Sequence, residues 1–255
     1  MMPQPTLRAC LLAALVAACL PGASPSSAAP MTPTRAPFFA AGPQAALEQA
    51  IRADDAAAIA RALAGGARVD ARGPHGVTPL MIAVDAQRPQ AVVALLRAGA
   101  APNDKAADRN GVVSLAIRNH LGEPSGREIL QAVLRAGGDP DTRRPDDDPV
   151  IFQIIDDHDV QGLRMLKSFG ADIDIRDRAG DPLITSVAMA QDWDMVWALI
   201  ELGARFDYEN GAARRPLSLS LGLAFPAPDS PLFADKYKVW QLLKDKGLPV
   251  KPLKH

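Results

Sequence analysis

The side chains able to do covalent or metal chemistry are few and widely separated in this chain of 255 residues. Both of its cysteines, Cys10 and Cys19, lie before residue 20. The rest of the chain therefore has no thiol for a disulfide, a nucleophile or a zinc site. The histidines lie far apart in the sequence: His75, His120, His158 and His255. Neither H-E-x-x-H, G-x-S-x-G nor a glycine-rich phosphate loop occurs, so we expect no enzyme activity, metal site or cofactor.

The two cysteines belong to a segment with the features of an export signal. Residues 10–18 are apolar and uncharged, a single cation, Arg8, precedes them, and prolines follow at once. A membrane-spanning helix needs about 20 apolar residues, so this run is too short and indicates export. The alternative is an ordinary buried first helix, which the prolines and the lack of an amphipathic pattern disfavour.

Two processing routes fit the residues that follow this run. Residues 16–19 (VAAC) resemble a bacterial lipobox, in which the cysteine is acylated and becomes the new N-terminus. The resemblance makes Cys19 the lipidation candidate, and Leu20 after it is similar to lipoproteins released to the outer membrane. Cleavage after the small residues 26–28 (SSA) would instead release a soluble periplasmic or secreted protein. We therefore expect a periplasmic protein anchored to the outer membrane, with a soluble protein cleaved near Ala28 as the alternative.

The overall charge limits the class of partner, and the local composition limits the extent of the folded region. The chain has 28 Lys+Arg and 29 Asp+Glu, a formal charge of -1. Because there is no basic excess to neutralise phosphates, nucleic acid is not an expected partner. Residues 20–43 contain six prolines among Ala and Ser. Such a composition cannot bury a core, so it predicts an extended tether.

A repeated glycine motif predicts the fold. A glycine, then a small residue, with Asp or Asn four positions after the glycine, recurs at intervals of 33, 38, 33 and 33 residues: Gly66, Gly99, Gly137, Gly170 and Gly203. This is a period of 33 with one insertion. Each period holds a polar turn, a short helix often opened by proline, and a second helix with apolar residues at i, i+3 and i+4. The glycine after the second helix can adopt the left-handed conformation that ends it.

These motifs resemble the ankyrin repeat. Residues 76–83 (GVTPLMIA) are similar to the pattern G-x-T-P-L-H-x-A with Met81 in place of His, and residues 95–103 (LLRAGAAPN) match L-L-x-x-G-A-x-x-N. The resemblance covers about residues 44–252. It implies an all-α solenoid of paired antiparallel helices with β-turn or hairpin fingers. The second repeat departs from the pattern, with no proline before its first helix and an insertion at 122–126 (GEPSG).

The repeat spacing predicts four full repeats between two capping units. The capping units of a solenoid need polar outer faces, so we expect the lysines of residues 235–247 on an uncovered face. The expected segments are a signal peptide with lipobox at 1–19, the tether at 20–43, an N-terminal cap at 44–70, repeats at 71–103, 104–141, 142–174 and 175–207, and a C-terminal cap at 208–255.

The resemblance implies a non-catalytic scaffold that binds another protein through its fingertips and the exposed ends of its first helices. The matching positions are His75, Asp85, Arg109, Asn110, His120, Asp146, Asp147, Asp156, Asp157, Arg178 and Asp181. Each of them could also be an ordinary solvated turn residue. Together they mix acidic and basic groups, which favours a protein partner over a polyanion. The acidic run at 146–148 lacks the spacing of a calcium-binding EF-hand loop.

An export signal followed by a binding scaffold predicts an adaptor or protector of another exported protein in a bacterial cell envelope. We expect a monomer that reaches the membrane only through its N-terminal lipid. An immunity protein that neutralises a periplasm-acting toxin is the alternative. A secreted effector is a third possibility, which the lipobox disfavours. Trp193 and Trp197, four residues apart on one expected helix, are interpreted as core residues rather than ligand contacts.

Overall fold

The computed structural model describes residues 37–119, 125–206, 217, 221, 230–248 and 250. The chain divides into two units, Met1–Ala36 and Pro37–His255, and all described residues lie in the second. The predicted signal peptide, Cys19, most of the predicted tether and His120 lie outside the described residues. Among the helices that the structure describes, none is long and apolar enough to cross a membrane.

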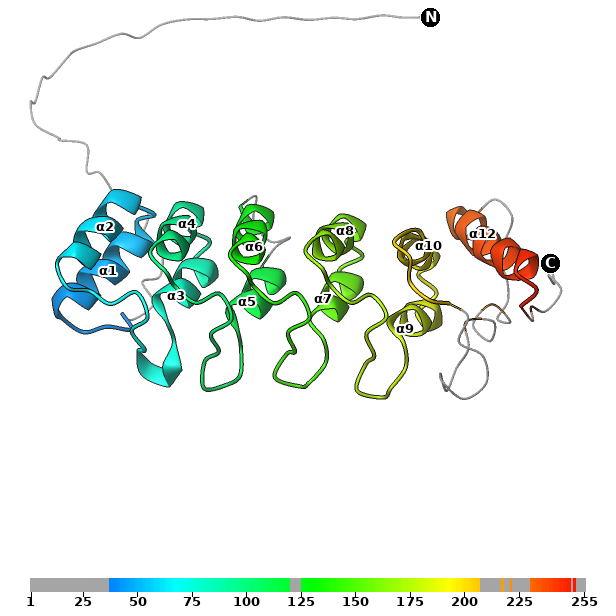
Figure 1. The fold of residues 1–255 in the computed structure, drawn as a ribbon, viewed down its shortest axis with the longest axis horizontal. Coiled ribbons are helices and arrows are strands. Elements are labelled where there is room, and N and C mark those ends of the chain that lie inside the picture. Colours follow the sequence, from blue (N-terminus) through cyan, green and yellow to red (C-terminus); the bar gives the residue numbers. More distant parts are fainter. Residues whose placement is uncertain are drawn as a thin grey trace, which may run out of the picture. The chain divides into compact units, whose positions relative to one another are not determined.

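Antiparallel helix pairs follow one another along the second unit (Figure 1). Helix α12 (Pro231–Asp245) packs against the last of these pairs, on α10. The pairs are α1 (Gly42–Arg52) with α2 (Ala56–Ala64), α3 (Pro79–Asp85) with α4 (Pro89–Arg97), α5 (Val112–Arg118) with α6 (Gly126–Arg135), α7 (Ile151–Asp156) with α8 (Val160–Ser168), and α9 (Leu183–Met189) with α10 (Trp193–Glu201).

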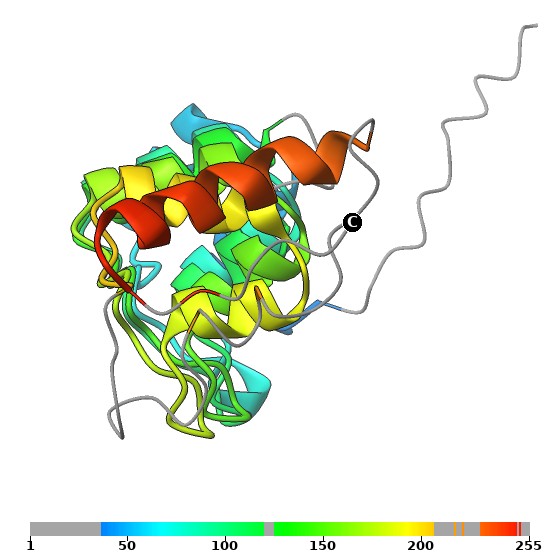
Figure 2. The same cartoon turned by 90° about the vertical axis from the view of Figure 1, so that its right-hand side faces the viewer.

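The pairs stack in register, so that first helices contact first helices and second helices contact second helices. Helix α3 packs between α1 and α5, and α4 packs between α2 and α6. Figure 2, which looks along the row, shows the two helix layers and the connecting loops gathered on one side. Each pair thus contacts only its neighbours, as in a solenoid.

Local sequence signals set where these helices begin and end. Pro79 and Pro89 stand in the first turns of α3 and α4, where a missing N–H leaves no hydrogen bond unmade. The hydroxyl of Thr78 accepts a hydrogen bond from Met81 N at 3.3 Å and caps α3. After the second helices the repeated glycine has a φ of 92° at Gly99 and between 89° and 96° at the other four positions. Since glycine adopts this conformation without strain, the period of glycines marks the helix ends.

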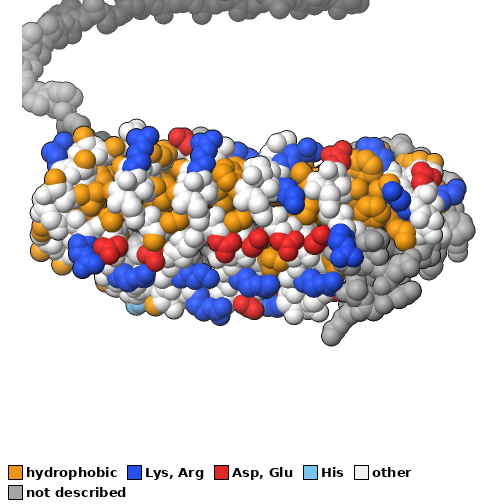
Figure 3. All heavy atoms as spheres, in the orientation of Figure 1, with side chains coloured by type: hydrophobic (Ala, Val, Ile, Leu, Met, Phe, Trp, Pro, Cys, Tyr) orange, Lys and Arg blue, Asp and Glu red, His pale blue; other side chains and the backbone are white. Residues whose placement is uncertain are grey.

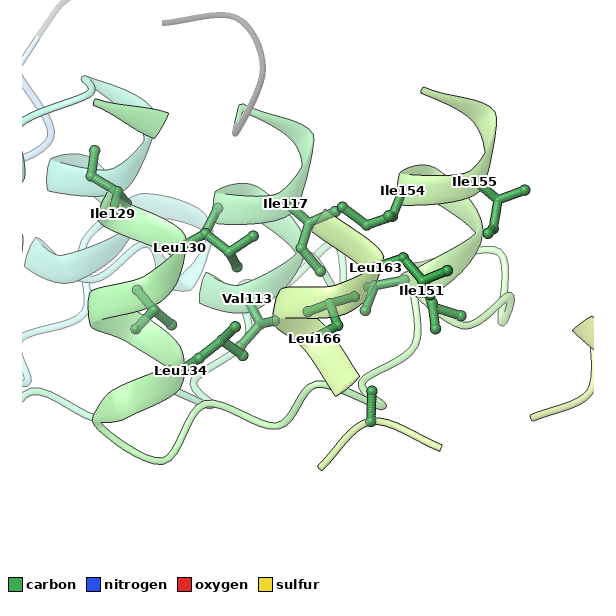
Figure 4. Close-up of a cluster of buried hydrophobic side chains, with 14 of the residues drawn as sticks. Val113, Ile117, Ile129, Leu130, Leu134, Ile151, Ile154, Ile155, Leu163 and Leu166 are labelled. Atoms are coloured by element: carbon green, nitrogen blue, oxygen red, sulfur yellow. The ribbon is translucent and has the colours of Figure 1, made fainter. Parts of the chain in front are cut away.

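The core lies between the two helix layers and continues from one pair to the next. Figure 4 shows apolar side chains from four successive helices, α5 to α8, pointing toward one another. All are at most 7 % exposed: Val113, Ile117, Ile129, Leu130, Leu134, Ile151, Ile154, Ile155, Leu163 and Leu166. Because one pair alone cannot cover both of its apolar sides, the stability of each repeat depends on its neighbours.

Four described fingers connect consecutive pairs, at residues 73–77, 106–110, 144–148 and 177–181. In each finger the N–H of the first residue donates to the carbonyl of the fifth at 2.8–3.0 Å. Antiparallel bridges close the last three: Lys105 with Gly111, Arg143 with Pro149, and Arg176 with Pro182. A short 3-10 turn, η1 (Pro74–Gly76), forms the first finger. The predicted stack of helix pairs with hairpin fingers is confirmed.

A continuous series of side-chain to backbone hydrogen bonds joins the loops between the second helices and the fingers. We call it the Asx ladder, and Figure 3 shows a row of acidic side chains below the helices on this face. Each Oδ1 atom lies 2.7–2.9 Å from the backbone N that it accepts from: Asn103 from Asp139, Asp139 from Asp141, Asp141 from Asp172, Asp172 from Asp174, and Asp174 from Arg205. The ladder explains the Asn or Asp four places after the glycine at Asn103, Asp141 and Asp174.

Replacing Asn103 tests how much the Asx ladder stabilises the stack. Asn103 also donates from Nδ2 to the Gly137 carbonyl at 2.9 Å, so it makes two contacts with the next repeat. We expect Asn103→Ala to lower the free energy of unfolding by about 2 kcal/mol, at about 1 kcal/mol for each hydrogen bond. Asn103→Asp keeps the acceptor but turns a carboxylate oxygen toward the Gly137 carbonyl, so it should lose at least the roughly 1 kcal/mol of the donated hydrogen bond. No loss of stability in urea denaturation of Asn103→Asp would contradict the two-bond account.

The structure differs from expectation at both ends of the described unit, in the starting residue at one end and in the burial of a lysine at the other. Helix α1 begins at Gly42, inside the segment expected to be tether, and Phe38 N and Phe39 N donate to Glu48 Oε2 at 2.8 and 2.9 Å. Folded structure therefore starts before residue 44, because the buried Glu48 carboxylate holds this backbone against α1. At the other end Lys236 is fully buried against α10. Lys236 therefore departs from the expected uncovered face, whereas Lys238, Lys244 and Lys246 are exposed.

Candidate protein-binding surface

The predicted partner-binding residues come from two kinds of element that meet on one surface. The fingers project from the stack, and the first helices α3, α5, α7 and α9 begin directly after them. We call the surface formed by the fingers and these first helices the palm. All described candidates lie on it, at the fingers or at the C-terminal ends of α3 and α7.

The fingertip candidates contact the neighbouring fingers, and one pair of candidates, Arg109 and Asp147, lies in mutual contact. The His75 carbonyl accepts a hydrogen bond from the second finger at 2.7 Å. Arg109 Nη2 lies 3.6 Å from Asp147 Oδ1, and Arg178 N donates to Asp148 Oδ1 at 3.3 Å. The side chains of Arg109, Asp147 and Arg178 are 63 %, 65 % and 69 % exposed. Exposed ion pairs contribute about 0–1 kcal/mol each, so a partner can replace these contacts at little cost.

The candidates at the ends of the first helices are held by polar neighbours. Asp85 Oδ1 lies 3.6 Å from Arg118 Nη2, which stands at the end of the next first helix. Both oxygens of Asp157 accept from Gln153 Nε2, at 3.2 and 3.3 Å. Partial burial raises the pKa of Asp156 above its ordinary value. Arg144 opposes this shift, whereas the negative charges of Asp157 and Asp148 reinforce it.

The remaining described candidates form hydrogen bonds or ion pairs within their own fingers. Asn110 donates from Nδ2 to Asp108 Oδ2 at 2.8 Å, and hydrogen bonds from Asn110 hold the pKa of Asp108 below its ordinary value. Asp146 Oδ1 lies 3.4 Å from Arg144 Nε. Asp181 N donates to Asp177 Oδ1 at 2.9 Å. Among the described residues, Asp181 is not seen in a hydrogen bond or ion pair with another candidate. His120 and Cys19 lie outside the described residues, so their roles stay predictions.

Apart from Asn110, the residues that line a small pocket in the palm were not predicted from the sequence. The pocket lies where α5 and α7 meet the second and third fingers, and its volume is about 60 Å³. Its polar residues include Ser114, Arg118, Arg144 and Gln153. One signal was available, since Arg118 occupies in the second repeat the position that Asp85 occupies in the first. Among the described residues no group of His, Cys, Asp or Glu is placed to hold a metal ion.

Comparisons with known proteins agree with this architecture. Residues 75–108 match the family model described as Ankyrin repeat. The crystal structure of the human ASB11 ankyrin repeat domain is similar with a TM-score of 0.55 at 21 % sequence identity, over 75 % of this chain and 81 % of that chain. A search of curated proteins gives no match.

The class of fold follows from these observations. The described part of the chain is an all-α ankyrin repeat solenoid, as the glycine period and the motif at 76–83 predict. Ankyrin repeats are generally scaffolds for protein–protein interaction and not enzymes. The palm described above is therefore the surface to consider for a partner.

Proposed function

We propose that this protein is a non-catalytic scaffold of a bacterial cell envelope that binds, and holds or protects, another exported protein. The observation that carries the proposal is the palm, on which charged side chains of both signs stand side by side over several repeats. Their mutual ion pairs are exposed and weak, so they can be exchanged for contacts with a partner. The export features of residues 1–19 and the proline-rich segment after them support an anchored location.

Site-specific photo-cross-linking in a bacterial host tests the scaffold role. A photoreactive residue in place of Arg109 or Arg178 should give discrete adducts with an exported protein of the envelope, because both side chains are largely exposed on the palm. The control is the same residue in place of Arg135, which is exposed on the second helix α6. Adducts of equal yield from position 135, or none from the palm positions, would contradict palm binding.

The proposed anchor has a separate test. Cys19→Ser should abolish incorporation of a palmitate label and move the protein from the membrane fraction to the soluble fraction, because only a cysteine thiol accepts the lipid. Cys10→Ser, in the same leader, should leave both properties unchanged. If the Cys19→Ser protein keeps the label and still sediments with membranes, the anchor is elsewhere.

A further inference from the structure

A small pocket in the palm has two buried hydrogen-bond donors in its wall that the described part of the chain leaves without an acceptor. The pocket has a volume of about 60 Å³ and lies where α5 and α7 meet the second and third fingers. Ser114 Oγ and Arg144 Nε are buried in its lining, and neither has a hydrogen-bond partner among the described residues. Ser114 as a whole is 9 % exposed. Because folded proteins rarely leave buried donors unpaired, two of them beside one cavity indicate a place for an acceptor atom of a ligand.

The two arginines of the pocket wall have their charges balanced by aspartates outside the lining. Arg144 Nε lies 3.4 Å from Asp146 Oδ1, an ion pair that does not have the geometry of a hydrogen bond. Arg144 Nη2 lies 3.4 Å from Asp148 Oδ2, and Arg118 Nη2 lies 3.6 Å from Asp85 Oδ1. Among the described residues that line the pocket there is no carboxylate. The pocket therefore offers donors to an occupant without requiring a further negative charge.

The pocket also provides an acceptor, an apolar wall and an opening. Gln153 uses its Nε2 to donate to both oxygens of Asp157, which leaves its Oε1 to accept a hydrogen bond. Ile117 and Val150, each 1 % exposed, form an apolar part of the wall. The side chain of Arg118 is 52 % exposed, so the pocket is open to solvent on that side. A single water needs roughly 10–15 Å³, so the pocket has room for the end of a side chain.

The chemistry of this wall favours a primary amide over other side-chain ends. A cation would face two guanidinium groups and leave Arg144 Nε unpaired. A carboxylate would lie close to the three aspartates that already contact those guanidinium groups, and like charges brought together are unfavourable. An apolar group would leave both buried donors unpaired, at about 1–3 kcal/mol each. A primary amide is uncharged and has both an accepting oxygen and donating N–H groups.

We propose that the palm across α5 and α7 binds a partner segment that carries a glutamine or asparagine, with the side-chain amide entering this pocket. This inference rests on the proposed function and names the chemistry of the partner. The amide oxygen accepts hydrogen bonds from Ser114 Oγ and Arg144 Nε, and the amide nitrogen donates to Gln153 Oε1. The methylene carbons of the entering side chain lie against Ile117 and Val150.

Titration of the full-length chain with single capped amino acids tests the proposal. The probes are the N-acetyl, N-methylamide derivatives of glutamine, asparagine, glutamate, lysine and leucine, which share their backbone groups and differ only in the side chain. Backbone NMR signals of Ser114 and Gln153 should shift saturably with an amide probe, which should bind about tenfold more tightly than the others. Equal or tighter binding of the glutamate or lysine probe overturns the proposal. No saturable shift with either amide probe would leave the pocket to water and overturns it too.

A variant that keeps the charge tests the Arg144 donor. Arg144→Lys retains a cation but removes the Nε donor, so it should weaken binding of the better amide probe about tenfold. Arg143→Lys is the matched control, because Arg143 donates from Nη1 to the Asp147 carbonyl at 2.6 Å and does not line the pocket. Its affinity for the probe should equal that of the wild type. Equal weakening by the two substitutions overturns the proposal.

The Ser114 hydroxyl gives a second test that leaves charge untouched. Ser114→Ala should weaken binding of the amide probe about threefold, in proportion to one lost hydrogen bond. The thermal midpoint of unfolding should not fall, because the hydroxyl has no described partner to lose in the free protein. Ser168→Ala, which removes a hydroxyl that donates to the Met165 carbonyl on α8, should leave the affinity unchanged. A lower midpoint for Ser114→Ala without a loss of affinity overturns the role of the pocket.

Cross-linking in the bacterial host distinguishes failure of this proposal from failure of the scaffold function. With the photoreactive residue in place of Arg178, adducts with an envelope protein should decrease when Ser114→Ala and Arg144→Lys are combined. Adducts that persist at full yield overturn the amide proposal, while the scaffold function stands. Adducts that are missing already in the protein with an intact pocket contradict the scaffold function itself.

Discussion

Replacing Asp192 by asparagine should raise the free energy of unfolding by about 3 kcal/mol near pH 8, and by little near pH 4. Asp192 caps α10, where its Oδ1 accepts from Met195 N at 3.3 Å, and its side chain is 3 % exposed. Burial raises the pKa of Asp192 from 3.8 to about 6, and Asp194 adds to the shift through a hydrogen bond and its charge. Above pH 6 the folded protein therefore holds a buried carboxylate that is costly to ionise.

The contact with His158 does not cancel this cost. His158 Nδ1 lies 2.6 Å from Asp192 Oδ2, and a charged imidazole there would lower the pKa of Asp192. The His158 side chain, however, is 70 % exposed, so water screens its charge, and the burial of Asp192 has the larger effect. Asparagine keeps the helix cap, because Asn and Asp cap helices about equally well.

The sign of the pH dependence follows from proton binding. Between pH 3.8 and about 6 the folded state binds more protons at Asp192 than the unfolded state does. The contribution of Asp192 to stability therefore grows as the pH falls through 6 and is lost as the pH rises through it. Urea denaturation of wild type and Asp192→Asn across this range should give curves that converge at low pH. A constant difference between them would contradict the raised pKa.

A variant at a second, exposed helix cap distinguishes the effect of burial on stability from the effect of capping. Asp55 caps α2, where its Oδ1 accepts from Ala58 N at 2.9 Å, but the side chain of Asp55 is 47 % exposed. Asp55→Asn therefore changes the same type of cap at a solvated position. It should alter the free energy of unfolding by no more than about 0.5 kcal/mol. A gain near pH 8 as large as that of Asp192→Asn would show that burial is not the cause.

Trp193→Ala should lower the free energy of unfolding by about 4 kcal/mol, as expected when a large aromatic core residue is truncated. Trp193 is 1 % exposed on α10, and Lys236 Nζ of α12 lies 5.0 Å from the centre of its ring. Gln191 Oε1 accepts from both Trp193 Nε1, at 3.4 Å, and Lys236 Nζ, at 3.2 Å. The substitution therefore removes the ring against which Lys236 of α12 is buried.

Hydrogen exchange of the backbone amides should show where in the structure Trp193→Ala lowers the stability. In Trp193→Ala the backbone amides of α12 should lose their protection first, because a terminal unit of a solenoid is held by one neighbour only. Trp197→Ala is the control, since Trp197 is half-buried and its Nε1 donates to the exposed Glu201 at 2.9 Å. That variant should lose about 1 kcal/mol. Equal losses for the two tryptophans, or α12 protection unchanged in Trp193→Ala, would contradict this account.

The features that sequence reasoning predicted are those that the backbone requires in every repeat. Glycine at a positive φ follows each described second helix, and the Asn or Asp four places later accepts an N–H group of the next repeat at Asn103, Asp141 and Asp174. Both depend on local geometry, so both recur with the period. The core position of Trp193 could be inferred as well, because apolar residues recur at helical spacing around it.

Contacts between particular side chains could not be predicted in the same way. Glu48 accepts hydrogen bonds from Phe38 N and Phe39 N at the start of the described stack. The repeat pattern does not extend to these residues, so it could not predict this contact. The pairing of Arg109 with Asp147 is hidden because the longer second repeat separates them by 38 residues rather than 33. Lys236 is buried because α12 packs on α10, and the sequence of α12 alone shows only an alternation of lysines with other residues.

The conformation of the fingertips has a consequence for how this surface can change in evolution. The same finger position has a φ of 75° at Gly76, 66° at Arg109, 72° at Asp147 and 85° at Gly180. A residue with a side chain is strained there by about 1–2 kcal/mol. The two middle fingers carry that strain, and their side chains are the two that meet. Replacing either residue by glycine should relieve this strain, so the protein keeps the two side chains that meet at these tips at a cost in stability.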